Sequence, residues 1–95
     1  MEGFATIDIE KIIGLVRQQE PNRQDLIKAL QNCIGGQWTS KGYYRFVDST
    51  NANQVGAEWQ FDENIILEQD NEGDIVLDFL KNGQIGGIEF IGLLD

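Results

Sequence analysis

The chain has no histidine, one cysteine and one proline among its 95 residues. Without histidine it lacks the side chain most often used as a general acid or base near neutral pH. Cys33 has neither a second cysteine for an internal disulfide nor a histidine with which to hold a structural metal. The sequence also contains no glycine-rich phosphate loop. We therefore expect no enzyme activity, no cofactor and no metal site.

Long apolar runs and a basic N-terminus are also missing. No segment reaches the roughly 18 apolar residues of a membrane helix. Three acids, Glu2, Asp8 and Glu10, precede the first lysine, unlike the start of a signal peptide. We expect a cytoplasmic protein with no membrane partner. A hydrophobic fraction of 41% is too high for a disordered chain, and 95 residues suit one core, so residues 1–95 are interpreted as a single domain.

Basic residues are scarce in the second half of the chain. Residues 1–47 hold six bases and five acids (+1), whereas residues 48–95 hold one base and eleven acids (−10), which gives the net charge of −9. Phosphate binding relies on clustered lysine and arginine, so nucleic acid is disfavoured as a direct partner. A basic protein is the more natural partner.

Two amphipathic helices are predicted before residue 36. Apolar side chains recur at helical spacing in two segments: Ile9, Ile12, Ile13 and Val16, then Leu26, Ile27, Leu30, Cys33 and Ile34. Asp8 is placed to cap the first helix, and Gly35-Gly36 supplies a left-handed stop for the second. Cys33 lies on an apolar stripe, which favours a buried structural thiol over a nucleophile.

Five strands are predicted after the helices, where the hydrophobic period changes to two. The segments are GYYRFV (42–47), VGAEWQF (55–61), ENIILEQ (63–69), DIVLDFL (74–80) and QIGGIEFI (84–91). In the second segment, Val55, Ala57, Trp59 and Phe61 share one side, and we expect Trp59 and Phe61 to face the core. The sequence therefore predicts an α+β fold with two N-terminal helices packed on one face of an antiparallel β-meander of about five strands.

Two turns set the predicted register. Asn82-Gly83 is typical of a two-residue hairpin turn. It would pair Leu80 with Ile85, Leu77 with Ile88 and Ile75 with Phe90. One side of the hairpin would then be wholly apolar: Ile75, Leu77, Phe79, Ile88 and Phe90. In EQDNEGD (68–74), a three-residue loop over 71–73 would pair Asp70 with Asp74 and place Ile65 and Leu67 on the same apolar side. Read as a calcium loop, the same segment puts Phe79 where the bidentate glutamate belongs, so a turn is favoured.

The opposite face of this sheet is predicted to mix aliphatic and acidic side chains. Its residues would be Ile66, Glu68, Val76, Asp78, Leu80, Ile85, Glu89 and Ile91. A solvated face is normally more polar. Two interpretations stay open: a loop or the C-terminus covers some of the aliphatics, or the face contacts a basic partner.

In the second interpretation, Glu68, Asp78 and Glu89 lie near the centre of the contact. Five turn acids would surround them: Asp62, Glu63, Asp70, Glu72 and Asp74. Two aromatic residues near the helix-to-sheet junction, Trp38 and Tyr43, are further candidates for partner contact, because aromatic side chains often anchor interfaces.

The segment DIVLDFLKNGQIGGIEFIGLL (74–94) resembles the glycine-turn hairpin, with a GIE-type motif, of a group of small bacterial proteins. With GAEWQFDENIILEQ (56–69) ahead of it, the chain is similar to immunity proteins of contact-dependent growth inhibition and other bacterial polymorphic toxin systems. These families share no universal motif, so no functional residue carries over by position. The resemblance implies binding and neutralisation of a cognate toxin domain, often a basic nuclease. The alternatives are an acidic module for another basic protein, a nucleic-acid mimic, and a self-associating domain such as a homodimer.

Overall fold

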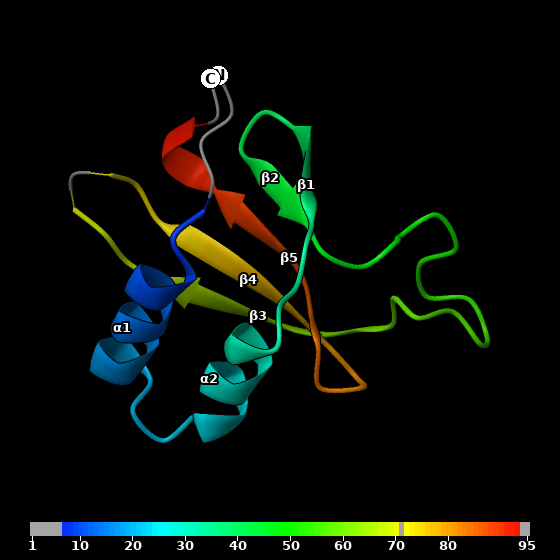
Figure 1. The fold of residues 1–95 in the computed structure, drawn as a ribbon, viewed down its shortest axis with the longest axis horizontal. Coiled ribbons are helices and arrows are strands. Elements are labelled where there is room, and N and C mark those ends of the chain that lie inside the picture. The colour runs from blue at the N-terminus through cyan, green and yellow to red at the C-terminus, as the bar shows by residue number, and fades with distance from the viewer. Residues whose placement is uncertain (1–6, 71, 94–95) are drawn as a thin grey trace.

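A computed structural model describes residues 7–70 and 72–93 (Figure 1). Two helices precede five strands and a short 3-10 helix: α1 (Ile9–Gln19), α2 (Gln24–Gln31), β1 (Gln37–Ser40), β2 (Tyr43–Arg45), β3 (Phe61–Leu67), β4 (Ile75–Leu80), β5 (Ile85–Phe90) and η1 (Ile91–Leu93). All strand pairs are antiparallel, in the order β1-β2-β5-β4-β3. The predicted class, two N-terminal helices on a five-stranded antiparallel sheet, is confirmed.

Helix α1 begins as its sequence predicts. The Asp8 carboxylate accepts a hydrogen bond from the backbone N–H of Lys11 at 3.1 Å, which satisfies one of the free donors of the first turn. The buried side chains of α1 lie on the predicted stripe: Ile12, Ile13 and Val16. Burial of this stripe fixes which side of the helix faces the sheet.

Helix α2 ends earlier than predicted. Its last residue is Gln31, so Ile34 lies beyond the helix and is 88% exposed instead of facing the core. Gly35 and Gly36 adopt the expected left-handed conformation, with φ of 70° and 92°. They redirect the chain towards β1 and do not cap the helix.

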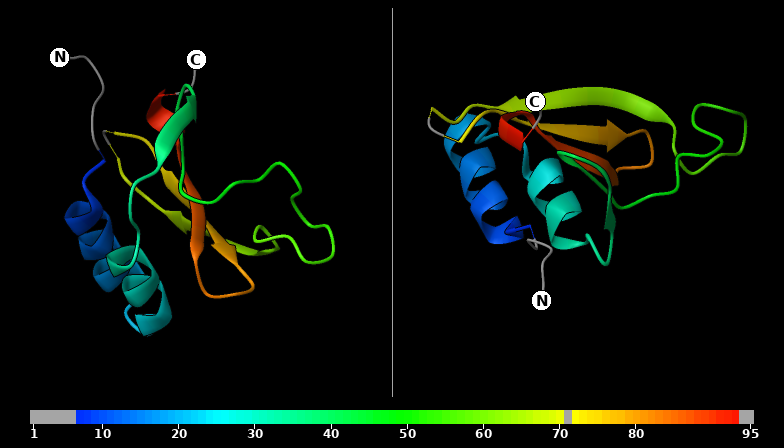
Figure 2. Two further views of the ribbon diagram at one scale, coloured as in Figure 1. Left: turned by 45° about the vertical axis from the view of Figure 1, so that its right-hand side comes forward. Right: turned by 90° about the horizontal axis from the view of Figure 1, so that it is seen from above.

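Both helices lie on one face of the sheet (Figure 2). The core joins side chains from α1, α2 and strands β3 to β5: Ile12, Ile13, Val16, Leu26, Ile27, Ala29, Leu30, Ile65, Leu67, Ile75, Leu77, Phe79, Ile85 and Ile88. The other face carries no helix in the described part of the chain. Among the described residues, no helix has the length and apolar character needed to cross a bilayer.

The turn between β4 and β5 is one residue longer than predicted. Leu80 donates its N–H to the carbonyl of Gln84 at 2.9 Å, and Gly83 donates to the carbonyl of Leu80 at 3.0 Å. Gly83 has a φ of 87°, as expected for a three-residue turn that ends in a left-handed residue. The predicted pairing of Leu80 with Ile85 is therefore wrong.

A β-bulge at Gly86 compensates for the longer turn. Phe79 pairs with Ile85, but Asp78 pairs with Gly87, so Gly86 is an extra residue in β5. Beyond the bulge the predicted pairs are confirmed: Leu77 with Ile88, and Ile75 with Phe90. The bulge turns Ile85 onto the core side, where it is buried, although it was expected on the opposite face.

The β3–β4 hairpin is shifted by two residues from the predicted register, because Ile65 and not Leu67 pairs with Leu77. A shift of two keeps every side chain on its face. Ile65 and Leu67 are therefore in the core as expected. Gly73 is left-handed as predicted, with a φ of 84°, whereas Asn71 of the predicted loop lies outside the described residues.

The predicted strand over 55–61 is wrong, because this segment forms a loop up to the start of β3. Val55 is fully exposed and Phe61 is 38% exposed, although both belong to the alternating apolar pattern. Gly56 has a φ of 82°, which breaks the extended conformation. Trp59 is buried, but apart from the helix–sheet core, where its ring packs on Gly86.

The fifth strand is instead β1, which the sequence pattern did not indicate. It forms a hairpin with β2, and β2 pairs with β5, so the sheet is not a simple meander. Strands β1 and β2 are consecutive neighbours, as are β3, β4 and β5, but β2 lies beside β5 and not beside β3. The loop after β2 carries the chain across the sheet to the far edge strand, β3 (Figure 1).

Leu77 is fully buried at the centre of the confirmed core pairs. We expect Leu77→Ala to lower the free energy of unfolding by about 2 to 5 kcal/mol, through lost burial and the cavity it leaves. Val55→Ala, at a fully exposed position, is the control and should change it by less than about 0.5 kcal/mol. Denaturant unfolding measures both, and equal effects would contradict this core.

Candidate functional site

The sheet face away from the helices, here called the open face, carries two neighbouring rows of side chains. One row holds Tyr43, Glu89, Val76 and Ile66, and the next holds Arg45, Gly87, Asp78 and Asn64. Alternation along each strand places them opposite the core residues. Asp78 and Glu89, predicted at the centre of a contact, therefore share this face with Tyr43.

Tyr43 and Asp78 are joined directly across the sheet. The Tyr43 hydroxyl donates a hydrogen bond to Oδ2 of Asp78 at 2.6 Å. To reach it, the Tyr43 ring crosses Gly87 of β5, where a Cβ atom would overlap the Tyr43 hydroxyl. Glycine at position 87 thus permits a bond between two strands that are not neighbours.

The environment of this pair disfavours negative charge. Burial raises the pKa of the Asp78 carboxyl, and the hydrogen bond from Tyr43 only partly opposes this. Burial also raises the pKa of Tyr43, as do its hydrogen bond to Asp78 and the nearby charges of Asp78 and Glu89, while Arg45 lowers it. The ionised Asp78 is therefore incompletely compensated, and a cation placed on the open face would stabilise it.

The structure divides the aliphatic residues that were predicted on this face. Leu80 is fully buried and Ile85 belongs to the helix-side core, so neither is available to a partner. Ile66 is 57% exposed and Ile91, in η1, is 40% exposed. Leu80 is therefore covered, whereas Ile66 stays accessible beside half-buried Val76.

Two of the five turn acids form ion pairs within the protein. Glu63 accepts from Arg23 at 2.6 Å, and the same guanidinium binds Asp25 at the start of α2. Glu72 pairs with Lys11 of α1 at 2.6 Å. These contacts attach helices to the sheet layer, so neither acid is a simple surface charge.

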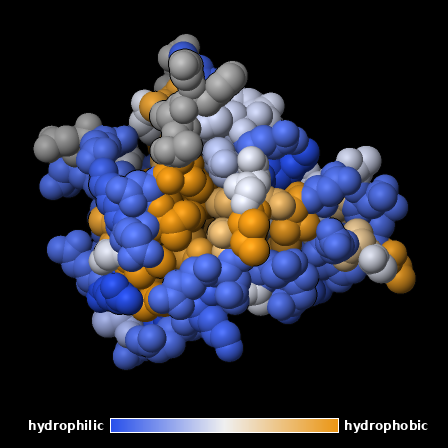
Figure 3. Space-filling model, viewed as in Figure 1, coloured by the Kyte–Doolittle hydropathy of each residue, from blue (hydrophilic) through white to orange (hydrophobic). Residues whose placement is uncertain are grey.

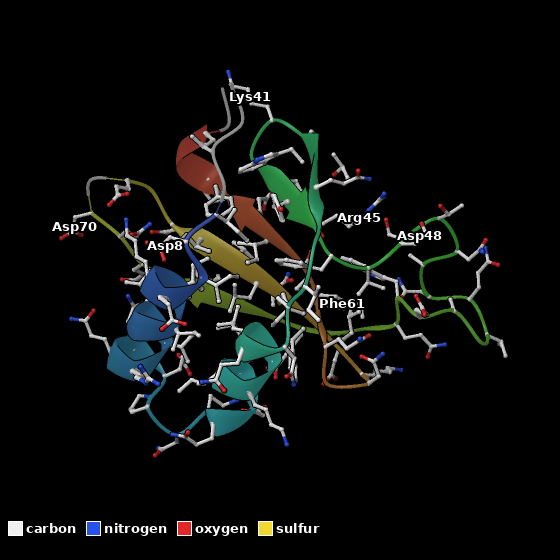
Figure 4. All side chains as sticks on the ribbon, viewed as in Figure 1. Asp8, Lys41, Arg45, Asp48, Phe61 and Asp70 are labelled. Carbon is white, nitrogen blue, oxygen red and sulfur yellow. The ribbon has the colours of Figure 1, made fainter. Side chains whose placement is uncertain are left out.

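The other predicted acids differ in their surroundings. Asp74 is half-buried, and its Oδ1 accepts from the backbone N–H of Gln69 at 3.3 Å. Asp62, Glu68 and Asp70 are exposed. Asp70 projects from the outer end of the β3–β4 turn (Figure 4). The negative charge most accessible to a partner therefore lies along β3 and its following turn.

Trp38 lies on the helix side of the sheet and not with Tyr43. Its ring packs against Tyr44 at a centroid distance of 5.1 Å and against Phe90 at 5.5 Å. A groove of about 450 Å³ lies between Trp38, Phe90 and the start of α1. Apolar surface is visible on this side between the helices and the β1–β2 hairpin (Figure 3). The two predicted aromatic candidates thus belong to different faces.

Cys33 lines a second groove on the helix side, of about 600 Å³, together with Phe46 and Phe79. Its thiol donates to the carbonyl of Ala29 at 3.4 Å, and burial raises its pKa to about 11. The thiol is therefore protonated at neutral pH and weakly nucleophilic. Within residues 7–70 and 72–93, no three His, Cys, Asp or Glu side chains come together as metal ligands.

The raised pKa of Asp78 predicts a pH-dependent effect of Asp78→Asn. A carboxyl whose pKa is raised by folding stabilises the fold while protonated, and this contribution is lost as the pH rises through the raised value. We expect the variant to gain stability relative to the parent as the pH rises from about 4, the ordinary pKa of an aspartate, through the raised value. Denaturant unfolding across this range measures the difference, with Asp70→Asn as a control at an exposed position. A pH-independent difference would contradict the assignment.

Most of the residues predicted at the centre of a partner contact lie on the open face. No protein-family model, curated protein or solved structure matches the chain.

Proposed function

We propose that this protein is an immunity-type inhibitor that binds and neutralises a basic bacterial toxin domain through its open face. The observation that carries the proposal is the half-buried Asp78, held by Tyr43 and close to Glu89. A lysine or arginine of a partner would complete the environment of this carboxylate. The exposed side chain of Ile66 supplies apolar contact in the adjoining row.

The charge of the whole chain supports the same function. A net charge of −9 attracts a basic partner over a distance and speeds the encounter. A nuclease active site is electropositive because it must attract phosphates. An acidic protein that covers such a site would inhibit it without any catalysis, and would do so in the cytoplasm of the cell that it protects.

The open face favours a protein partner over the role of a nucleic-acid mimic. Its charges are not a continuous acidic series, because Arg45, Val76 and Ile66 alternate with Asp78 and Glu89. A mimic of the phosphate backbone requires repeated negative charges. Mixed aliphatic and acidic side chains are typical of a contact with a basic protein.

The proposal predicts different kinetic effects for two charge reversals, measured with a basic toxin domain that co-purifies with the protein from its native cell. Glu89→Lys, near the centre of the face, should fold normally and weaken the one-to-one complex at least about tenfold, chiefly through faster dissociation. Asp70→Lys, on the outer turn, should mainly slow association at low salt. Surface plasmon resonance at two salt concentrations separates the two effects.

Glu10→Lys is the matched control, because Glu10 is an exposed acid in the first turn of α1, on the helix side. It should leave dissociation unchanged. If Glu89→Lys and Asp70→Lys fold normally and bind with the kinetics of the parent protein, the open face is not the inhibitory surface.

A further inference from the structure

Strand β3 is an edge of the sheet, and side chains cover its backbone at both ends. The Gln19 amide of α1 accepts from the N–H of Glu68 at 2.7 Å and donates to the carbonyl of the same residue at 2.8 Å. At the other end, Asn53 accepts from the N–H of Phe61 at 2.9 Å. Each side chain thus satisfies a backbone group that a neighbouring strand would otherwise bind.

The bonds of Glu68 show which residues of β3 face outwards. In an antiparallel ladder, residues bonded to one neighbour alternate with residues whose N–H and C=O point the other way. Because both groups of Glu68 point away from β4, the same groups of Ile66 and Asn64 also point outwards. The edge between the two side-chain caps therefore presents two N–H and two C=O groups in line.

The side chains along this part of the edge are acidic and apolar. Asp62, Asn64 and Glu68 are exposed, and Ile66 is 57% exposed. Residues 46–80 include no lysine or arginine. A second copy of the chain would place this acidic edge against another like it, whereas a basic strand would meet it with the opposite charge.

We propose that β3 binds an extended segment of the partner as a sixth strand, and that this segment carries lysine or arginine at alternate positions. Its backbone bonds to Asn64 and Ile66. Its basic side chains approach the exposed acids Asp62 and Glu68. This proposal rests on the proposed function, since Ile66 belongs to the row that includes Val76, Glu89 and Tyr43. The new element of the proposal is that the contact with the partner begins at the β3 edge of the sheet.

Amide hydrogen exchange of the intact protein tests the geometry without any substitution. The probe is a capped hexapeptide of alternating lysine and valine, and the control is the same peptide with glutamate in place of lysine. The lysine peptide should slow exchange at Asn64 and Ile66 at least about fivefold, because their outward N–H groups become bonded. Ile65 and Leu67, which point towards β4, should change little.

A matched pair of variants isolates the backbone contribution. Asn64→Pro removes an outward N–H and leaves the β3–β4 ladder intact, since proline is tolerated at that position of an edge strand. Asn64→Ala removes only the side chain. We expect the lysine peptide to protect the Ile66 amide in the alanine variant and not in the proline variant. The thermal midpoint establishes whether both variants are folded. If the proline variant is not folded, the exchange experiment on the parent protein tests the proposal.

Three outcomes would overturn the proposal. The lysine peptide at several millimolar protects neither Asn64 nor Ile66, the glutamate peptide protects them equally, or protection appears with protein concentration alone and so reveals a second copy at the edge. Peptide binding that shifts the resonances of Tyr43 and Glu89 but spares β3 would reject the edge and leave the proposed function standing. The proposed function fails separately, if Glu89→Lys and Asp70→Lys both bind the toxin domain with the kinetics of the parent protein.

Discussion

The two adjacent glycines in strand β5, Gly86 and Gly87, are the constraint on which both faces of the sheet depend. The extra residue at Gly86 allows Ile85 and Ile88 to face the core, although they are three positions apart and a regular strand would place them on opposite sides. The carbonyl of Gly86 also accepts the N–H groups of the two residues after β2, at 2.8 and 3.1 Å. One irregularity therefore sets the register of the core, the attachment of the loop and the packing of Trp59.

The acids of the second half serve two purposes. Glu63 and Glu72 are paired with Arg23 and Lys11, so they join each helix to the sheet, and Arg23 also lies 5.8 Å from the ring centroid of Phe79. Exposed ion pairs of this kind contribute at most about 1 kcal/mol, so their value lies mainly in orientation. The acids on and beside the open face do not join the helices to the sheet in this way. A large negative charge thus contains a structural part and a part that is available to a partner.

Elements that depend on local chemistry could be predicted from the sequence. The cap at Asp8, the buried stripe of α1 and the left-handed Gly83 follow from spacing and side-chain type. The predicted pairs of Leu77 with Ile88 and Ile75 with Phe90 are present because the bulge at Gly86 offsets a turn that is one residue longer than predicted. The composition of the open face could be predicted in part, because the positions of its central residues depend only on alternation along β4 and β5.

The remaining features depend on contacts distant in sequence. Val55 belongs to an alternating apolar pattern like that of a strand, but the residues before β3 form a loop in which Gly56 breaks the extended conformation. The bulge at Gly86 has no signal other than the glycine itself, so Ile85 was placed on the wrong face. Two other contacts join residues from separate hairpins or layers: the hydrogen bond from Tyr43 to Asp78, and the pair of hydrogen bonds between Gln19 and Glu68. Neither hydrophobic period nor turn chemistry predicts such pairs.

The strand order has a consequence for how the chain folds. The β1–β2 hairpin and the β3–β4–β5 meander each contain contacts between residues close in sequence, but the pairing of β2 with β5 joins the two across a long intervening segment. Closing that segment costs chain entropy that local hairpins do not pay. We therefore expect the meander to form first and β2 to dock last. Until it does, the central strand β5 is itself a temporary edge, and the rate of that docking determines how long it stays exposed to other chains.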